Sequence, residues 1–135
     1  IHGVIDRVDQ NSSGQLRVID YKTGSMHQTQ NDLTDGYRLQ LPIYALAARD
    51  ALLLGEPVDG FYWQVLNAQA SSLKLAKVST ETLKGVEAAV EVVYGHLIRI
   101  LHGIRSAEFP PRPPRGGCLS YCPAASWCWR YEPGR

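Results

Sequence analysis

The sequence lacks a long hydrophobic run: no apolar stretch in its 135 residues approaches the roughly 18 residues that a membrane-spanning helix needs. We therefore do not expect an integral membrane protein. It also lacks net charge, because 14 Lys and Arg against 13 Asp and Glu leave +1. That balance excludes both a uniform polycation that coats nucleic acid and an acidic disordered tail. An initiator methionine and a signal peptide are absent as well, since the chain begins at Ile1 inside an apolar stretch.

Cysteine is scarce and unevenly placed, with three residues that all fall in the last 18. A secreted disulfide scaffold would have an even number. Six of the eight prolines also fall in residues 110–135. Residues 105–135 carry five Arg against two acids, +3, whereas residues 1–104 carry nine bases against eleven acids, −2. The length fits one hydrophobic core. We therefore expect a core at residues 1–104 and a Pro- and Arg-rich tail at residues 105–135.

Alternating apolar residues predict strands over residues 1–9 and 15–22, joined by a turn, which makes a β-hairpin. A three-residue loop ending in Gly14 would place Asp6 directly opposite Asp20, whereas a two-residue loop would send Asp20 to the other face. We favour the first register because it gathers the apolar residues of both strands, Val4, Val8, Leu16 and Val18, on one face together with Lys22.

The rest of the core reads as alternating helices and strands. After a polar loop from Gly24 to about Asp35, we expect a helix over residues 36–54. Proline is tolerated only in the first turn of a helix, so Pro42 allows a start as late as Leu39. The remaining expected elements are strands over residues 58–66 and 73–78 and a long helix over residues 80–104.

Two like charges directly opposite in a hairpin destabilise it unless a cation lies between them. The oxygen ligands of Asp6 and Asp20 suit Mg²⁺ or Mn²⁺, and the backbone carbonyl of Tyr21 could add a neutral ligand. Lys22 shares their face and could orient a metal-bound water or stabilise charge on a phosphate. The alternative is a hairpin with its charges on a solvated face, because Asp-x-Lys tripeptides are common.

The two motifs together, Gly3-Val4-Ile5-Asp6-Arg7-Val8-Asp9 and Asp20-Tyr21-Lys22, resemble those of the PD-(D/E)XK nuclease superfamily, and in detail its RecB-like branch. Gln40-Leu41-Pro42-Ile43-Tyr44 is similar to the Gln-x-x-x-Tyr motif of that branch. The resemblance implies an α/β restriction-endonuclease-like core, with a mixed β-sheet, an active-site hairpin and flanking helices. It also implies that Asp6 and Asp20 bind the metal, that Lys22 is the catalytic lysine, and that Gln40 and Tyr44 support the site or touch DNA.

Members of this family have a helix before the first strand, which usually places a His or Glu beside the metal. This chain starts too late to contain such a helix. We therefore expect an N-terminally truncated domain with an incomplete metal site and weak or no activity as it stands.

The cysteines, Cys118, Cys122 and Cys128, are closely spaced in a loop-rich tail. They are free thiols, three of four zinc ligands, or three of four ligands to an iron–sulfur cluster. The resemblance favours the last alternative, because AddB-type and CRISPR-associated nucleases hold a [4Fe–4S] cluster with one cysteine before the nuclease core and three after it. We expect the fourth cysteine to lie outside this chain. The aromatic residues Tyr121, Trp127 and Trp129 would then shield the cluster from water.

The leading hypothesis is a Mg²⁺- or Mn²⁺-dependent deoxyribonuclease, an exonuclease that acts on DNA ends or single strands. The resemblance implies a helicase partner, a role in DNA repair and recombination, and the bacterial cytoplasm beside the nucleoid. Two alternatives stay open. One is an inactive DNA-binding or scaffolding module of the same fold, although the intact Asp, Asp and Lys set argues against lost chemistry. The other is a zinc-stabilised protein-interaction domain, which leaves the hairpin acids unexplained.

Overall fold

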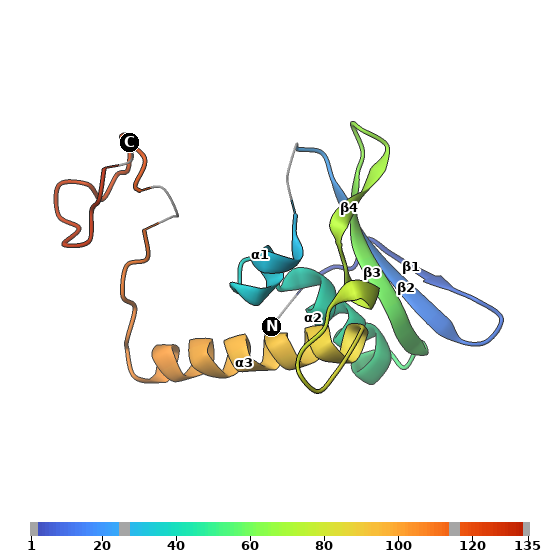
Figure 1. Ribbon diagram of the computed structural model, residues 1–135. Helices are drawn as coiled ribbons and strands as arrows, with labels where there is room; N and C mark the ends of the chain where they lie inside the picture. The colour runs from blue at the N-terminus through green and yellow to red at the C-terminus, as the bar shows by residue number, and fades with distance from the viewer. Residues whose placement is uncertain (1–2, 25–27, 114–116, 134–135) are drawn as a thin grey trace. The chain divides into compact units, whose positions relative to one another are not determined.

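The structure is a computed structural model that describes residues 3–24, 28–113 and 117–133 (Figure 1). The chain forms two compact units, Ile1–Ile98 and Arg99–Arg135. The first unit holds the sheet and most of the helices. The second holds the last turns of the long helix and the cysteine-bearing tail. The predicted division into a core at residues 1–104 and a tail at residues 105–135 stays a prediction.

A four-stranded mixed sheet is the centre of the first unit. Its strands lie in the order β1 (Arg7–Gln10), β2 (Gln15–Lys22), β3 (Glu56–Gln64) and β4 (Gln69–Lys74). The β1–β2 and β3–β4 pairs are antiparallel, whereas β2 and β3 are parallel. The helical crossover between β2 and β3 makes the parallel pair possible. The expected α/β class with a mixed sheet and flanking helices is confirmed.

The hairpin has the register that the sequence favoured. Arg7 is the Cα partner of Ile19 and Val8 that of Val18, so continuing by one residue brings Asp6 opposite Asp20. Gly14 closes the loop with φ of 76°, in the left-handed region that glycine adopts without strain. Strand β1 begins later than expected, and Val4, which precedes it, is 72% exposed instead of packed.

The helices begin and end where local chemistry requires. The described helices are α1 (Gln30–Thr34), α2 (Gln40–Leu46) with its π-helical extension (Ala47–Ala51), and α3 (Val86–Arg105). Helix α2 starts after Leu39, which places Pro42 in the first turn, as expected. Helix α1 lies inside the segment predicted as a loop. A reciprocal capping box between Thr29 and Asp32 stabilises its start.

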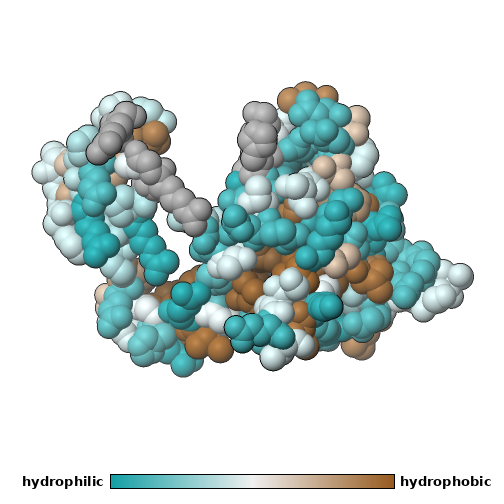
Figure 2. Space-filling model, in the orientation of Figure 1, coloured by the Kyte–Doolittle hydropathy of each residue, from teal (hydrophilic) through white to brown (hydrophobic). Residues whose placement is uncertain are grey.

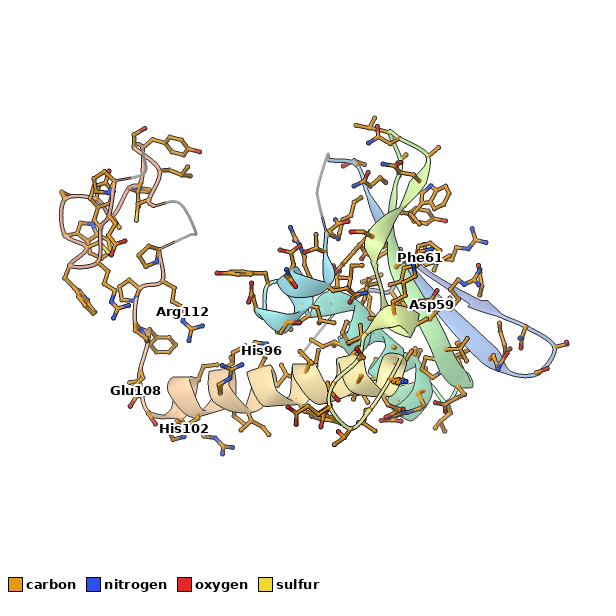
Figure 3. The ribbon with its side chains drawn as sticks, in the orientation of Figure 1. Asp59, Phe61, His96, His102, Glu108 and Arg112 are labelled. Carbon is orange, nitrogen blue, oxygen red and sulfur yellow. The ribbon has the colours of Figure 1, made fainter. Side chains whose placement is uncertain are left out.

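Strand β4 and helix α3 both differ from expectation at their starts. Strand β4 ends at Lys74, and Leu75–Lys77 forms a 3-10 turn, so the predicted strand over residues 73–78 was placed too late. Helix α3 begins at Val86, because residues 80–85 form a bridge and turn in which Gly85 has φ of 69°. His96 Nε2 lies 2.9 Å from the backbone oxygen of Thr34, and this contact ties α3 to α1 (Figure 3).

One face of the sheet carries the hydrophobic core, and the helices of the first unit lie on that side (Figure 1). The core consists of residues from β2, β3, β4 and all three helices: Val18, Leu33, Leu41, Ala45, Tyr62, Leu73, Leu75, Val78, Val86, Ala88, Ala89, Val90 and Val93. Further along α3 the hydrophobic side chains are exposed. Ile98 and Ile104 are 65% and 56% accessible, and brown residues appear at the surface in Figure 2.

Among the described residues, no helix is both long enough and apolar enough to span a membrane.

Candidate active site

Strand β2 is paired on both sides, so its inward-facing residues are buried, including a carboxylate. Asp20 is 2% exposed, and its Oδ2 lies 2.5 Å from Lys22 Nζ. Apart from this ion pair, Asp20 Oδ2 accepts no hydrogen bond of good geometry within the described ranges. A buried carboxylate oxygen with one cation and no hydrogen bond is short of the partners that offset its desolvation. It therefore has capacity for a further cationic ligand.

Asp6 reaches the same end of β2 from the exposed segment before β1. Its Oδ2 accepts a hydrogen bond from the backbone N–H of Tyr21 at 2.9 Å. The side chain of Tyr21 points the other way and accepts a hydrogen bond from Arg7 Nη1 at 3.2 Å. Arg7 also pairs with Asp9 at 2.7 Å, and this bond raises the pKa of the guanidinium. Arg7 and Asp9 therefore form a structural ion pair of the hairpin.

Helix α2 brings Gln40 and Tyr44 to the lysine, one turn apart on one helix face. Lys22 Nζ donates to Gln40 Oε1 at 3.0 Å, and Gln40 Nε2 donates to the Tyr44 hydroxyl at 2.9 Å. A continuous polar chain therefore runs from Asp20 through Lys22 and Gln40 to Tyr44. The motif glycine has a role here as well, since a Cβ on Gly3 would come within 3.2 Å of the Tyr44 ring.

The sequence did not single out Tyr62, whose ring lies beside Lys22 in this polar chain. Tyr62 is the register partner of Asp20 on β3 and is 1% exposed, and its ring centroid lies 5.2 Å from Lys22 Nζ. Burial, and then the charge of Asp20, raise the pKa of Tyr62 to about 12, so the hydroxyl stays neutral. The signal was available in part. Alternation along β3 assigns Tyr62 to one face of that strand, but only the pairing of β2 with β3 shows that Asp20 lies on the same face.

A cavity of about 990 Å³ adjoins the polar chain of Asp20, Lys22, Gln40 and Tyr44. It lies between α2 and the segment before β1. Gln40 and Tyr44 form part of its wall, and most of the other lining residues, such as Ile5 and Ile43, are apolar. A substrate group in this cavity could therefore touch the support residues without passing through the core.

The two carboxylates fit a hard divalent cation better than zinc. Within the described part of the chain, no three or more His, Cys, Asp or Glu residues converge on one point. A tetrahedral zinc site would need such a group. Mg²⁺ needs only one or two carboxylates, because water and substrate phosphate supply its other ligands. The underpartnered oxygen of Asp20, with Asp6 opposite, matches that requirement.

In the second unit, the three free cysteines line one cavity of about 320 Å³, together with Arg112 and Arg130. Two local turns position them. The N–H of Cys122 donates to the carbonyl of Leu119 at 3.0 Å, and the N–H of Cys128 donates to that of Ala124 at 2.8 Å. The three thiols therefore share one cavity but do not converge as a metal-binding group in this structure, which describes all three of them.

The expected aromatic shield around the cysteines is wrong. The side chains of Tyr121, Trp127 and Trp129 are 77%, 76% and 74% exposed. Arg130 lies over the Trp129 ring at 4.8 Å from its centroid, outside any apolar shell. Of the three aromatic residues, only Tyr121 is among the residues that line the cysteine cavity, and the half-buried cysteines otherwise lie among prolines, Leu119, Ala124 and the two arginines.

Comparison with known proteins agrees with this geometry. The chain is 36% identical over 93 residues to a component of the ATP-dependent helicase/deoxyribonuclease of Carboxydothermus hydrogenoformans, a match that covers 61% of this chain. The chain spans only 8% of that relative's length. No solved structure matches it. The family profile of the PD-(D/E)XK nuclease superfamily matches residues 1–129, and the chain therefore belongs to that superfamily.

Proposed function

We propose that this chain is a deoxyribonuclease domain that hydrolyses DNA phosphodiesters with Mg²⁺ or Mn²⁺. The observation that carries the proposal is the continuous polar chain of Asp20, Lys22, Gln40 and Tyr44, with Asp6 at its open end. Membership of a nuclease superfamily supports the same chemistry.

Asp6, Asp20 and the carbonyl of Tyr21 would hold the cation. When bound, it supplies charge stabilisation for the phosphate and lowers the pKa of a coordinated water. The remaining work belongs to the side chains. Lys22, held between Asp20 and Gln40, presents its ammonium to the phosphate, where negative charge develops during hydrolysis. The bond from Gln40 to Tyr44 fixes the amide so that its oxygen faces the lysine.

The likeness to a component of a helicase/deoxyribonuclease supports a finer assignment. We assign the chain to a bacterial helicase–nuclease of DNA repair and recombination in the cytoplasm. There it acts as an exonuclease on DNA ends or single strands, beside a helicase domain or subunit.

The cysteine cavity would hold three ligands of a [4Fe–4S] cluster, with the fourth cysteine outside this chain. A [4Fe–4S] cluster takes thiolate ligands, and Cys118, Cys122 and Cys128 line one cavity. They form no metal-binding group by themselves, so they would have to draw together on the cluster. Anaerobic reconstitution with iron and sulfide should give a brown protein, and Cys122→Ser should abolish the colour. A colourless protein that binds zinc instead would overturn the cluster assignment.

The test of nuclease function is cleavage of a labelled single-stranded oligonucleotide with Mn²⁺, compared with EDTA. In this assay we expect this chain by itself to be weakly active. Lys22→Ala should lower the rate about 100-fold or more, because it removes a preorganised charge at the phosphate. Lys84→Ala, at an exposed lysine, is the matched control and should cut at the parental rate. If the chain binds DNA but Lys22→Ala changes no cleavage rate, the inactive DNA-binding module is the better description.

A further inference from the structure

The face of the sheet opposite the core carries an ordered set of aromatic and basic side chains. We call it the outer face and define it by Arg7, Asp9, Arg17, Ile19, Tyr21, Asp59, Phe61, Trp63, Ala70 and Lys74. Figure 3 shows Asp59 and Phe61 on the side of β3 that faces away from the helices. The 3-10 helix Leu75–Lys77 contacts this face through the hydrogen bond from the Ala76 N–H to Asp59, and none of the outer-face residues belongs to the core cluster.

The strand registers arrange the outer face in three rows. The middle row crosses all four strands as Arg7, Ile19, Phe61 and Lys74, with a cation at each end. The row nearest the active site is Tyr21, Trp63 and Ala70. The third row is Asp9, Arg17 and Asp59. Aromatic rings therefore occupy two adjacent rows of the central strands.

The rings and cations touch. The Phe61 and Trp63 centroids lie 6.5 Å apart with a tilt of 51°. Two cations flank the Phe61 ring, with Arg17 Cζ at 5.9 Å and Lys74 Nζ at 5.8 Å from its centroid. Tyr21 is 40% exposed. Phe61, Trp63 and Lys74 are partly exposed and Arg17 is exposed, so a ligand could reach all of them.

The acids of the outer face, Asp9 and Asp59, lie in the third row on either side of Arg17, next to the row of Phe61. Asp9 pairs with Arg7. Asp59 Oδ1 accepts hydrogen bonds from the N–H groups of Gly60 and Ala76, at 2.8 and 3.1 Å. With Arg7 paired to Asp9, the remaining charges of the outer face are those of Arg17, Lys74 and Asp59, a net +1 beside the rings, which favours an anionic ligand with flat apolar groups.

We propose that the outer face binds single-stranded DNA, with bases stacked on Tyr21, Phe61 and Trp63 and phosphates at Arg17 and Lys74. Sheet aromatics with flanking cations suit this ligand because every base has a stackable face and every nucleotide has a charge. The inference rests on the proposed nuclease function and deepens it. Tyr21 and Lys22 are consecutive on β2 and face opposite sides, so a strand bent over this end of the sheet reaches both surfaces.

The test is binding of a fluorescent oligo-dT to the 135-residue chain in EDTA, followed by anisotropy, so that cleavage plays no part. The double variant Arg17→Gln/Lys74→Gln should weaken binding about tenfold and lower the slope of log K against log salt by about 1.4, for two lost phosphate contacts. Trp63→Leu should also weaken binding about tenfold, because it removes one stacking partner. Lys84→Gln is the matched control and should bind like the parent.

Photocrosslinking locates the contact. Oligonucleotides with 5-iodo-deoxyuridine should crosslink to the peptide that contains Phe61 and Trp63. Crosslinks only to Trp127 or Trp129, or equal binding by the double variant and the parent, would overturn the proposal. A face that captures only an acidic protein segment, and no oligonucleotide, would overturn it as well.

The inference and the nuclease function can fail separately. Mn²⁺-dependent cleavage by a double variant that binds DNA like the parent would leave the nuclease intact and remove the outer-face site. Binding that depends on the outer face, without cleavage by the parent, would keep the outer-face site and remove the nuclease function.

Discussion

The two compact units of this chain are held together in different ways. The first unit buries a contiguous hydrophobic cluster between one face of its sheet and three helices. In the second unit, no described residue is buried, and Phe109, Tyr121, Trp127 and Trp129 are each more than 70% exposed. Short backbone turns are the main interactions described there.

The difference shows which unit can be stable through burial alone. A small segment without a core needs a metal, a cross-link or a partner, because local hydrogen bonds do not offset the entropy of ordering the chain. The cysteines of the second unit are the residues that could supply a metal-based cross-link. The first unit has its polar chain preformed by packing.

The largest expected effect is on cleavage, which depends on the first unit, and not on iron binding by the second. Asp20→Asn should lower cleavage about 1,000-fold, because it removes one metal ligand and the counter-ion of Lys22. Iron incorporation at the cysteines should stay at the parental level. Rate measurements with Mn²⁺, beside iron analysis of the reconstituted protein, check both. Loss of iron together with activity would show that the units are not independent.

A buried and an exposed leucine compare the packing of the units directly. Leu41→Ala removes a fully buried side chain from α2 and should lower the free energy of unfolding by about 3 kcal/mol. Leu119 is 54% exposed, so Leu119→Ala should change the free energy of unfolding by less than about 0.5 kcal/mol. Urea unfolding followed by circular dichroism measures both. Similar losses in the two variants would contradict the contrast.

A buried and an exposed tyrosine compare the two units through the pH dependence of stability. The pKa of Tyr62 is raised from 10.0 to about 12, so the folded state keeps a proton that the unfolded state releases. The linked stability is complete below pH 10 and is lost between pH 10 and 12, about 3 kcal/mol in all. Tyr62→Phe should flatten this decline in melting temperature. Tyr121→Phe, at a 77% exposed residue, should leave it unchanged.

The smallest expected effect concerns positioning inside the first unit. Gln40→Ala leaves Asp20 beside Lys22 but removes the acceptor at 3.0 Å, so the ammonium should become less well oriented. We expect kcat to fall about tenfold with little change in KM, the pattern of an interaction made mainly in the transition state. Steady-state kinetics distinguish this from lost binding, in which KM alone would rise.

The hairpin could be predicted because short-range rules determine it, whereas the bond from Lys22 to Gln40 joins β2 to α2 and depends on tertiary packing. Gly14 specifies the loop, the loop specifies the register, and the register places Asp6 opposite Asp20. Helical spacing likewise puts Gln40 and Tyr44 on one face. Within the hairpin and within α2, the motif residues therefore lie where a local reading places them.

What the sequence did not predict depends on contacts between distant segments. Strand β4 ends at Lys74, where the 3-10 helix Leu75–Lys77 begins, and its pairing with β3 shifts register between Phe61 and Trp63. Alternation along one strand reveals neither feature. The contact of Tyr62 with Lys22 arises from the parallel pairing of β2 with β3. Whether Trp127 and Trp129 are buried depends on tertiary contacts, and the sequence only shows that they lie near cysteines.

The parallel pairing of β2 with β3 also sets an order for biosynthesis. The hairpin pairs neighbours in sequence, so β1 and β2 can associate soon after Lys22 leaves the ribosome. Asp20 acquires its second neighbour only when Tyr62 has been synthesised, after the whole helical crossover. Until then, one edge of β2 has unpaired backbone groups. The chain is therefore most exposed to misassembly while its candidate site is half built.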